Sequence, residues 1–142
     1  MKIIAQNKKA YFEYEILEKY EAGIQLRGDE IKAIRANKAT LIGSYAKILI
    51  SDREPEVYWV GGNLADTADP QRTRKLLLHR DEINKLIGKT REKGLTLIAT
   101  KLYLKHGKAK LEIALCKGKK LHDKREALKK KDVERRTRRG DF

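Results

Sequence analysis

Short runs in which apolar residues occupy every second position predict most of the regular structure of this chain. The clearest run covers residues 109–115, in which Leu111, Ile113 and Leu115 alternate with more polar or smaller side chains. Because successive side chains of a strand point to opposite faces, this run predicts a strand with one buried face. We expect the residues between them, Ala114 included, to face solvent.

A second apolar run, at residues 95–104, precedes this strand and is separated from it by the short segment 105–108. Gly107 lies in that segment and can adopt the positive φ that a tight turn requires. The two runs therefore predict a β-hairpin.

Residues 45–50 and 57–60 form another pair of apolar runs, separated by the segment 51–56. Asp52 and Pro55 in that segment are typical of turns, so the pair predicts a second hairpin. Residues 11–17 predict one more strand.

Two helices are indicated by apolar residues spaced three and four apart. Asp29 is the expected N-cap of a helix at 30–36, and Asp81 that of a helix at 82–93, with Gly94 following at the C′ position.

A short helical turn is expected at 71–75, after Pro70, since proline fits the first helical position. Many short strands with two or three short helices predict a mainly β fold, specifically a small, partly open β-barrel.

Charge changes this picture at the C-terminal end. The chain carries a net charge of +14, and residues 117–142 hold twelve Lys and Arg against five Asp and Glu. Such a tail has little to bury, but it can displace counterions from a polyphosphate. We expect a folded body at 1–120 and a basic tail at 121–142, loose when free and helical on a charged surface. A purely solubilising tail is the alternative.

Membrane and secretory functions are not favoured. No apolar run approaches the ~20 residues that span a bilayer, the N-terminal apolar stretch is too short for a signal peptide, and the tail lacks the apolar face of a membrane-surface helix. A single cysteine allows no intrachain disulfide, so we expect a cytoplasmic protein.

No catalytic or metal-binding constellation is evident, and we expect neither an enzyme nor a cofactor or metal. His79, His106 and His122 occur in unlike contexts without a second ligand at metal-site spacing. Cys116 has no neighbouring base and is expected to be a small apolar residue at a strand end. A small basic nuclease and a ribosomal-protein-like subunit remain alternatives.

Basic residues cluster at the ends of the predicted elements, where the loops of a small barrel gather. Taken singly, each cluster is more often solvated surface, but together they favour RNA contact. The residues expected to take part on this ground are Lys8, Lys32, Arg35, Arg74, Lys75, Lys117, Lys119 and Lys120.

Six motifs, in order, make the chain resemble small protein B, the SsrA-binding family of bacterial trans-translation. The resemblance covers nearly the whole chain. The motifs are Ala5-Gln-Asn-Lys-Lys-Ala10 leading to Tyr14, Tyr20-Glu-Ala-Gly-Ile24, Gly28-Asp-Glu-Ile-Lys-Ala-Ile-Arg35, Asp69-Pro-Gln-Arg-Thr-Arg-Lys-Leu-Leu-Leu78, Gly94-Leu-Thr-Leu97 and Lys117-Gly-Lys-Lys-Leu-His-Asp-Lys-Arg125.

The resemblance implies an OB-like β-barrel with flanking helices, and a monomer. It implies a non-catalytic adaptor that binds the tRNA-like domain of transfer-messenger RNA and enters a stalled ribosome. The tail is then expected in the mRNA path, near the decoding centre of the small subunit.

Residue roles are implied by the same resemblance. Matches to positions involved in RNA binding are Asn7, Tyr14, Glu21, Leu77 and Lys110. Those that match or extend the ribosome-directed motif are Asp123, Lys124, Arg125, Lys129, Lys130, Lys131, Arg135 and Arg136.

Three features depart from the family pattern. The stretch 60–69 is shorter than the usual loop and lacks its Pro-aromatic element, Phe12 replaces a histidine of some relatives, and the sequence ends without their apolar pair.

Overall fold

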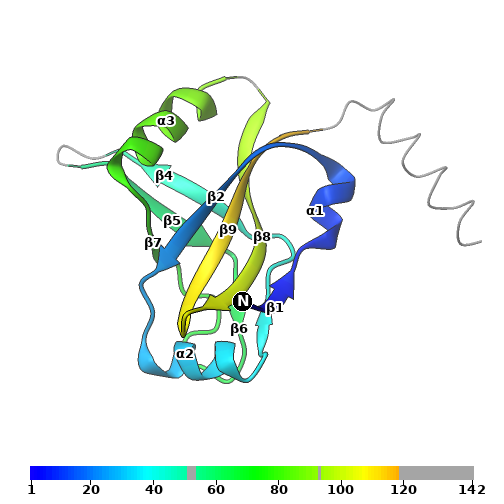
Figure 1. Ribbon diagram of the computed structural model, residues 1–142, viewed down its shortest axis with the longest axis vertical. Coiled ribbons are helices and arrows are strands. Elements are labelled where there is room, and N and C mark those ends of the chain that lie inside the picture. The colour runs from blue at the N-terminus through cyan, green and yellow to red at the C-terminus, as the bar shows by residue number, and fades with distance from the viewer. Residues whose placement is uncertain (51–53, 93, 119–142) are drawn as a thin grey trace, which may run out of the picture.

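The computed structural model describes residues 1–50, 54–92 and 94–118 and shows short helices packed around antiparallel strands (Figure 1). The helices are α1 (Lys8–Glu13), α2 (Gly28–Arg35) and α3 (Arg80–Thr90). The strands are β1 (Lys2–Gln6), β2 (Tyr14–Ile24), β3 (Ala39–Thr40), β4 (Tyr45–Leu49), β5 (Glu56–Val60), β6 (Asn63–Leu64), β7 (Arg74–Leu77), β8 (Leu95–Lys105) and β9 (Lys108–Gly118).

Six of these strands close into a ring. The order is β8-β4-β5-β7-β2-β9, and β9 pairs back with β8, while β1 adds to the outer edge of β8. The ring confirms the prediction of a mainly β, OB-like fold with short flanking helices. In Figure 1, α3 covers one end of the ring and α2 the other, and α1 lies against the side.

Both predicted hairpins are present. β4 pairs with β5, and β8 pairs with β9 along nearly its full length. Gly107 has a φ of +75° and its neighbour His106 a φ of +52°. Two successive residues with positive φ make the tight turn that matches the twist of the two strands.

Two segments differ from the predictions. Residues 11–13 belong to α1, and the strand begins only at Tyr14, because Asn7 caps a helix that the apolar pattern did not reveal. Residues 74–77 form strand β7 rather than a helical turn. The reason is burial: Arg74 and Leu76 point inward, while Leu77 is exposed.

The two longer helices begin earlier than predicted. α2 has Arg27 as its N-cap and α3 has His79, so neither Asp29 nor Asp81 caps a helix. In each helix a glutamate three residues past the cap accepts a hydrogen bond from the N–H of the cap residue, as in a capping box. α3 ends at Thr90, and Gly94, with φ +85°, lies in the following turn.

The buried residues of the ring, among them Trp59, Leu102 and Ile113, form one hydrophobic core. Ala114 was predicted to face solvent but is fully buried. It lies between Lys19 of β2 and Ile98 of β8, and α1 packs against both of these strands.

Candidate nucleic-acid interface

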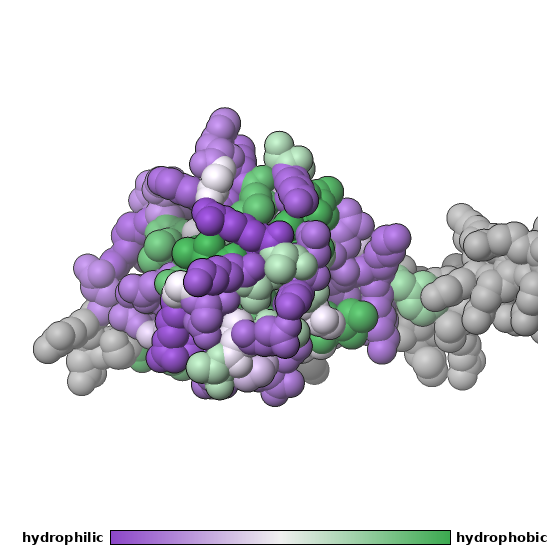
Figure 2. Space-filling model, turned by 90° about the horizontal axis from the view of Figure 1, so that it is seen from below, coloured by the Kyte–Doolittle hydropathy of each residue, from purple (hydrophilic) through white to green (hydrophobic). Residues whose placement is uncertain are grey.

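The candidate site is a groove of about 600 Å³ between α2 and the start of α3. Its walls come from β2, β7, α2, the start of α3 and the β8–β9 turn, segments that are far apart in the sequence. Four predicted RNA-binding residues line it: Glu21, Arg35, Leu77 and Lys110. Figure 2 looks at the end of the molecule that α2 covers and shows apolar side chains between many hydrophilic ones.

Strand pairing explains why these residues meet. Gly23 of β2 lies opposite Leu77 of β7 on one side and opposite Lys110 of β9 on the other. Directly opposite residues of an antiparallel pair share a face of the sheet, and Glu21 lies on that face two residues before Gly23. A larger residue at position 23 would crowd Leu77, because its Cβ would lie only 3.3 Å from the Cβ of Leu77.

Leu77 supplies an exposed apolar surface beside this row. Its exposed fraction is 53%, high for a leucine that belongs to a strand. Ile24, Leu26 and Leu78 are half-buried and continue the apolar lining. An apolar surface of this kind fits the face of an unstacked base better than it fits a phosphate.

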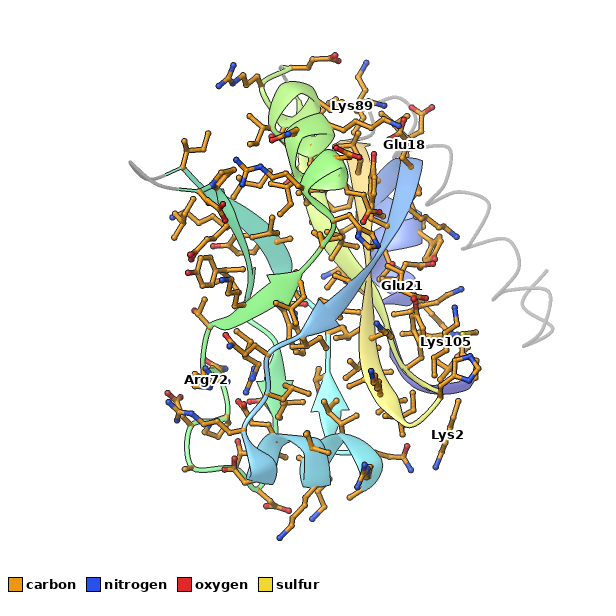
Figure 3. The ribbon with its side chains drawn as sticks, turned by 60° about the vertical axis from the view of Figure 1, so that its left-hand side comes forward. Lys2, Glu18, Glu21, Arg72, Lys89 and Lys105 are labelled. Carbon is orange, nitrogen blue, oxygen red and sulfur yellow. The ribbon has the colours of Figure 1, made fainter. Side chains whose placement is uncertain are left out.

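Glu21 is held in place by two neighbours. The phenol of Tyr103 donates a hydrogen bond to its Oε2, and the Nζ of Lys105 lies 3.4 Å from the same oxygen. The hydrogen bond from Tyr103, with the positive charges of Lys105 and Lys110, holds the pKa of Glu21 below its ordinary value. In Figure 3, Glu21 and Lys105 lie on the same side of the ring.

Positive charge surrounds the groove. Arg35 lines it from α2, and Lys108 and Lys110 line it from β9. Lys32 lies on α2, three residues before Arg35, but does not line the groove. Cations at the rim and an apolar floor suit a ligand that has both phosphates and bases.

A buried ion pair fixes α2 against β7. The carboxylate of Glu30 accepts hydrogen bonds from Arg74 Nε at 2.6 Å and from Arg72 Nη2 at 2.6 Å. Burial would raise the pKa of Glu30, but hydrogen bonds from Arg72, from the N–H of Arg27 and from Arg74 outweigh it and hold the pKa at about 2.

Arg74 is therefore corrected from a predicted RNA contact to a core residue. Its exposure is 0%, its guanidinium lies over the ring of Trp59, and it donates to the carbonyl oxygens of Gly62 and Pro70. The basic motif could not reveal this, because an arginine looks the same in sequence whether its partner is a phosphate or a buried glutamate.

Asn7 also has a local structural role. It is 3% exposed, its Oδ1 accepts from the N–H of Ala10 and its Nδ2 donates to the carbonyl oxygen of Ala99. We remove it, too, from the set of direct contacts. Tyr14 is half-buried beside it, in a separate pocket of about 290 Å³ that exposed Ile42 and Tyr45 also line.

The other predicted cations lie outside the groove. Lys8 is exposed on α1, Lys117 is exposed at the end of β9, and Lys75 pairs with Glu56 at 3.6 Å. The remaining predicted residues are not among the described ones. They are Lys119, Lys120, Asp123, Lys124, Arg125, Lys129, Lys130, Lys131, Arg135 and Arg136.

Sequence reasoning missed three participants: Gly23, Tyr103 and Lys108. Tyr103 lies opposite Lys110, so a correct register for the predicted β8–β9 hairpin would have placed it beside the site. Nothing in the sequence pairs Gly23 with Leu77, because β7 was not predicted.

The cysteine and the two described histidines lie where the sequence predicted them. Cys116 is fully buried, as expected of a small apolar residue, and burial raises the pKa of its thiol to about 11. His79 begins α3 and His106 lies in the β8–β9 turn, as predicted. Within the described ranges, no three His, Cys, Asp or Glu side chains gather as metal ligands, and no helix is long and apolar enough to cross a membrane.

The closed antiparallel ring, the short helices and the groove define a small OB-like β protein whose surface suits nucleic acid. Comparison with known proteins makes this specific. The family model described as SmpB protein matches residues 4–140. The chain therefore belongs to the SmpB family.

Individual relatives agree over nearly the full length. The SsrA-binding protein of a Nitratiruptor species is 53% identical over 97% of this chain and 95% of its own. That of Thermosipho africanus is 50% identical over 96% and 94%. A solved structure described as "tmRNA-SmpB: a journey to the center of the bacterial ribosome" matches with a TM-score of 0.70, 40% identity, and coverage of 90% of this chain and 95% of that one.

Proposed function

We propose that this chain is a non-catalytic RNA-binding adaptor of trans-translation. It binds the tRNA-like domain of transfer-messenger RNA and delivers that RNA to stalled ribosomes for rescue and peptide tagging. One observation carries the proposal: the fold gathers Glu21, Leu77 and Lys110 from three strands into one groove, and the resemblance had assigned RNA binding to all three.

The chemistry of the groove supports RNA as the ligand. Leu77 offers an apolar surface to an unstacked base, Glu21 offers a fixed acceptor, and Lys110 and Arg35 offer cations to phosphates. The carboxylate of Glu21 would repel a phosphate, so a groove that bound only a phosphate would be weakened by it.

The relatives support the partners. They are called SsrA-binding proteins, and the solved structure is described as tmRNA-SmpB in the bacterial ribosome. We infer that the basic tail, including Asp123, Lys124 and Arg125, acts at the small subunit, in the mRNA path near the decoding centre. We also propose a cytoplasmic location, since the ribosome is there, and a monomer, as the family resemblance implies.

Gel-shift titration tests the proposal. The full chain is titrated against transfer-messenger RNA and against an unrelated RNA of the same length, at several salt concentrations, because phosphate contacts alone give salt-dependent but unselective binding. We expect tighter binding of transfer-messenger RNA throughout. Equal affinity for both RNAs at every salt concentration would overturn the proposal.

A second assay tests the non-catalytic part. Labelled RNA is incubated with the protein and Mg²⁺, and we expect it to stay intact. Cleavage that persists through repeated purification would instead identify a nuclease.

A further inference from the structure

Tyr103 lies beside the groove, on the same face of the sheet as Lys110, and is 5% exposed. It belongs to β8, opposite Lys110 of β9, and its phenol reaches across β9 to donate a hydrogen bond to Glu21 of β2. Its ring is buried, so its one polar atom has a fixed position. Glu21, by contrast, is 40% exposed at its side chain and faces the groove.

This contact determines what Glu21 can offer a ligand. Tyr103 and Lys105 both engage Oε2, and no contact involving Oε1 is found in the described part of the chain. A carboxylate has free rotation about its side-chain bonds unless it is held, and an ionised one only accepts hydrogen bonds. Glu21 is thus a preoriented acceptor.

We propose that Tyr103 is a positioning residue that fixes Glu21 to accept hydrogen bonds from the N–H edge of an unpaired base in the groove. The proposal rests on the proposed function and deepens it by naming what the groove reads. A phosphate is excluded as the group that Glu21 contacts, since the two are both negative. The apolar surface of Leu77 beside Glu21 provides a face on which such a base can lie.

The chain contains a matched control for this contact. Tyr20, which is 8% exposed, donates a hydrogen bond to Glu18, and Glu18 also pairs with Lys89 of α3. None of these three residues lines the groove, and Glu18 and Lys89 lie beside α3, away from Glu21 and Lys105 (Figure 3). Tyr20→Phe therefore removes the same kind of bond from a similarly buried ring.

The experiment measures Kd for transfer-messenger RNA and for an unrelated RNA of equal length, at several salt concentrations. The proteins are the wild type, Tyr103→Phe, Glu21→Gln, the double variant and Tyr20→Phe. Loss of one hydrogen bond to a charged group predicts that Tyr103→Phe binds transfer-messenger RNA about tenfold more weakly. We expect the double variant to be no weaker than Glu21→Gln, the salt dependence to be unchanged, and Tyr20→Phe to bind like wild type.

Other results overturn the inference. Wild-type affinity of Tyr103→Phe alongside a weakened Glu21→Gln means that Tyr103 does not position the carboxylate. Equal loss for both RNAs means that Glu21 contacts a group that both RNAs present alike, such as a ribose hydroxyl, and not a base held selectively in the groove. If wild type itself shows no preference for transfer-messenger RNA, the proposed function fails as well.

A measurement without any variant covers the case in which Tyr103→Phe does not fold. NMR titration of the Glu21 carboxylate in the free wild-type protein should give a pKa below its ordinary 4.5. An ordinary pKa there contradicts the hydrogen bond on which the inference rests.

Discussion

At the scale of single residues, two glutamates illustrate how position decides the role of one side-chain type. Glu30 is 2% exposed and holds two arginines, so it serves the fold. Glu21 is partly exposed and faces the groove, where we propose that it contacts the ligand. Both glutamates belong to the sequence motifs, and only their burial in the structure distinguishes a glutamate that stabilises the fold from one that can contact a ligand.

Glu30→Gln should destabilise the protein strongly. The substitution leaves the buried guanidinium of Arg74 without its charged partner, and breaking a buried ion pair costs about 3 to 5 kcal/mol. Urea unfolding measures the loss. The control is Glu13→Gln, whose exposed i,i+4 pair with Lys9 at 3.6 Å should contribute less than about 0.5 kcal/mol. A similar small loss for both variants would contradict this account of Glu30.

The same carboxylate predicts a pH dependence. Its pKa is lowered from 4.5 to about 2 on folding, so its contribution is present above pH 4.5 and is lost as the pH falls toward 2. We expect wild-type stability to decline across this window. In Glu30→Gln the free energy of unfolding should fall less across this pH range, because Glu30 no longer titrates. Parallel curves of unfolding free energy against pH for the two proteins would refute the lowered pKa of Glu30.

Leu77→Ala should weaken RNA binding without weakening the fold. Leu77 is 53% exposed, so truncation removes little buried surface, but it removes the apolar surface offered to a base. We expect about three- to tenfold weaker binding of transfer-messenger RNA in gel shifts, in line with the loss of one stacking contact. Leu49→Ala, at a leucine 45% exposed on β4 and outside the groove, should bind normally. An equal loss of RNA affinity in Leu77→Ala and Leu49→Ala would show that the groove is not the RNA-binding site.

At the scale of elements, the segments that were predicted correctly are those whose signal is local. The β8–β9 hairpin has alternation in both strands and Gly107 at its turn, so neighbouring residues suffice to predict it. β7 depends on Arg74 pointing into the core toward Glu30, 44 residues away in sequence, and no local pattern carries that information. α1 is six residues long and is set by Asn7, too short for periodicity to reveal.

The candidate site divides in the same way. Glu21, Leu77 and Lys110 were named through a family resemblance, and strand register brings them together. Charge alone also predicted an RNA contact for Arg74. That prediction is wrong because Arg74 is buried, and a basic motif in the sequence does not show whether a residue is buried.

Two glycine substitutions should act in opposite directions. Gly107→Ala places a side chain at φ +75° in the β8–β9 turn, which costs about 1 to 2 kcal/mol, and because Gly107 lines the groove, RNA binding should weaken too. Gly88→Ala, in α3 with open space around its Cβ, should stabilise the protein by about 0.5 to 1 kcal/mol. Thermal unfolding reports both, and a stabilising Gly107→Ala would contradict the turn geometry.

At the scale of the whole molecule, positive charge is concentrated toward the C-terminal end of the sequence. The residues from 117 onward hold half of the net charge of +14, while the body holds the groove. A body that selects one RNA and a basic segment that contacts a second polyanion would let one small protein connect the two.

Deleting residues 129–142 should separate these activities. Affinity for transfer-messenger RNA should remain close to that of the full chain, because the groove is untouched, whereas peptide tagging on stalled ribosomes should be lost. A reconstituted tagging assay measures the second effect, with Leu77→Ala as the complementary variant that is impaired in binding. Normal tagging by the truncated protein would show that the tail only aids solubility.

The central claim is that the groove recognises one RNA and does not merely attract polyanions. The most direct measurement is the affinity of the full chain for transfer-messenger RNA compared with an ordinary tRNA at matched salt. We expect transfer-messenger RNA to bind at least about tenfold more tightly, with the difference persisting as salt weakens both complexes. Equal affinity for the two RNAs across the salt series would contradict the account.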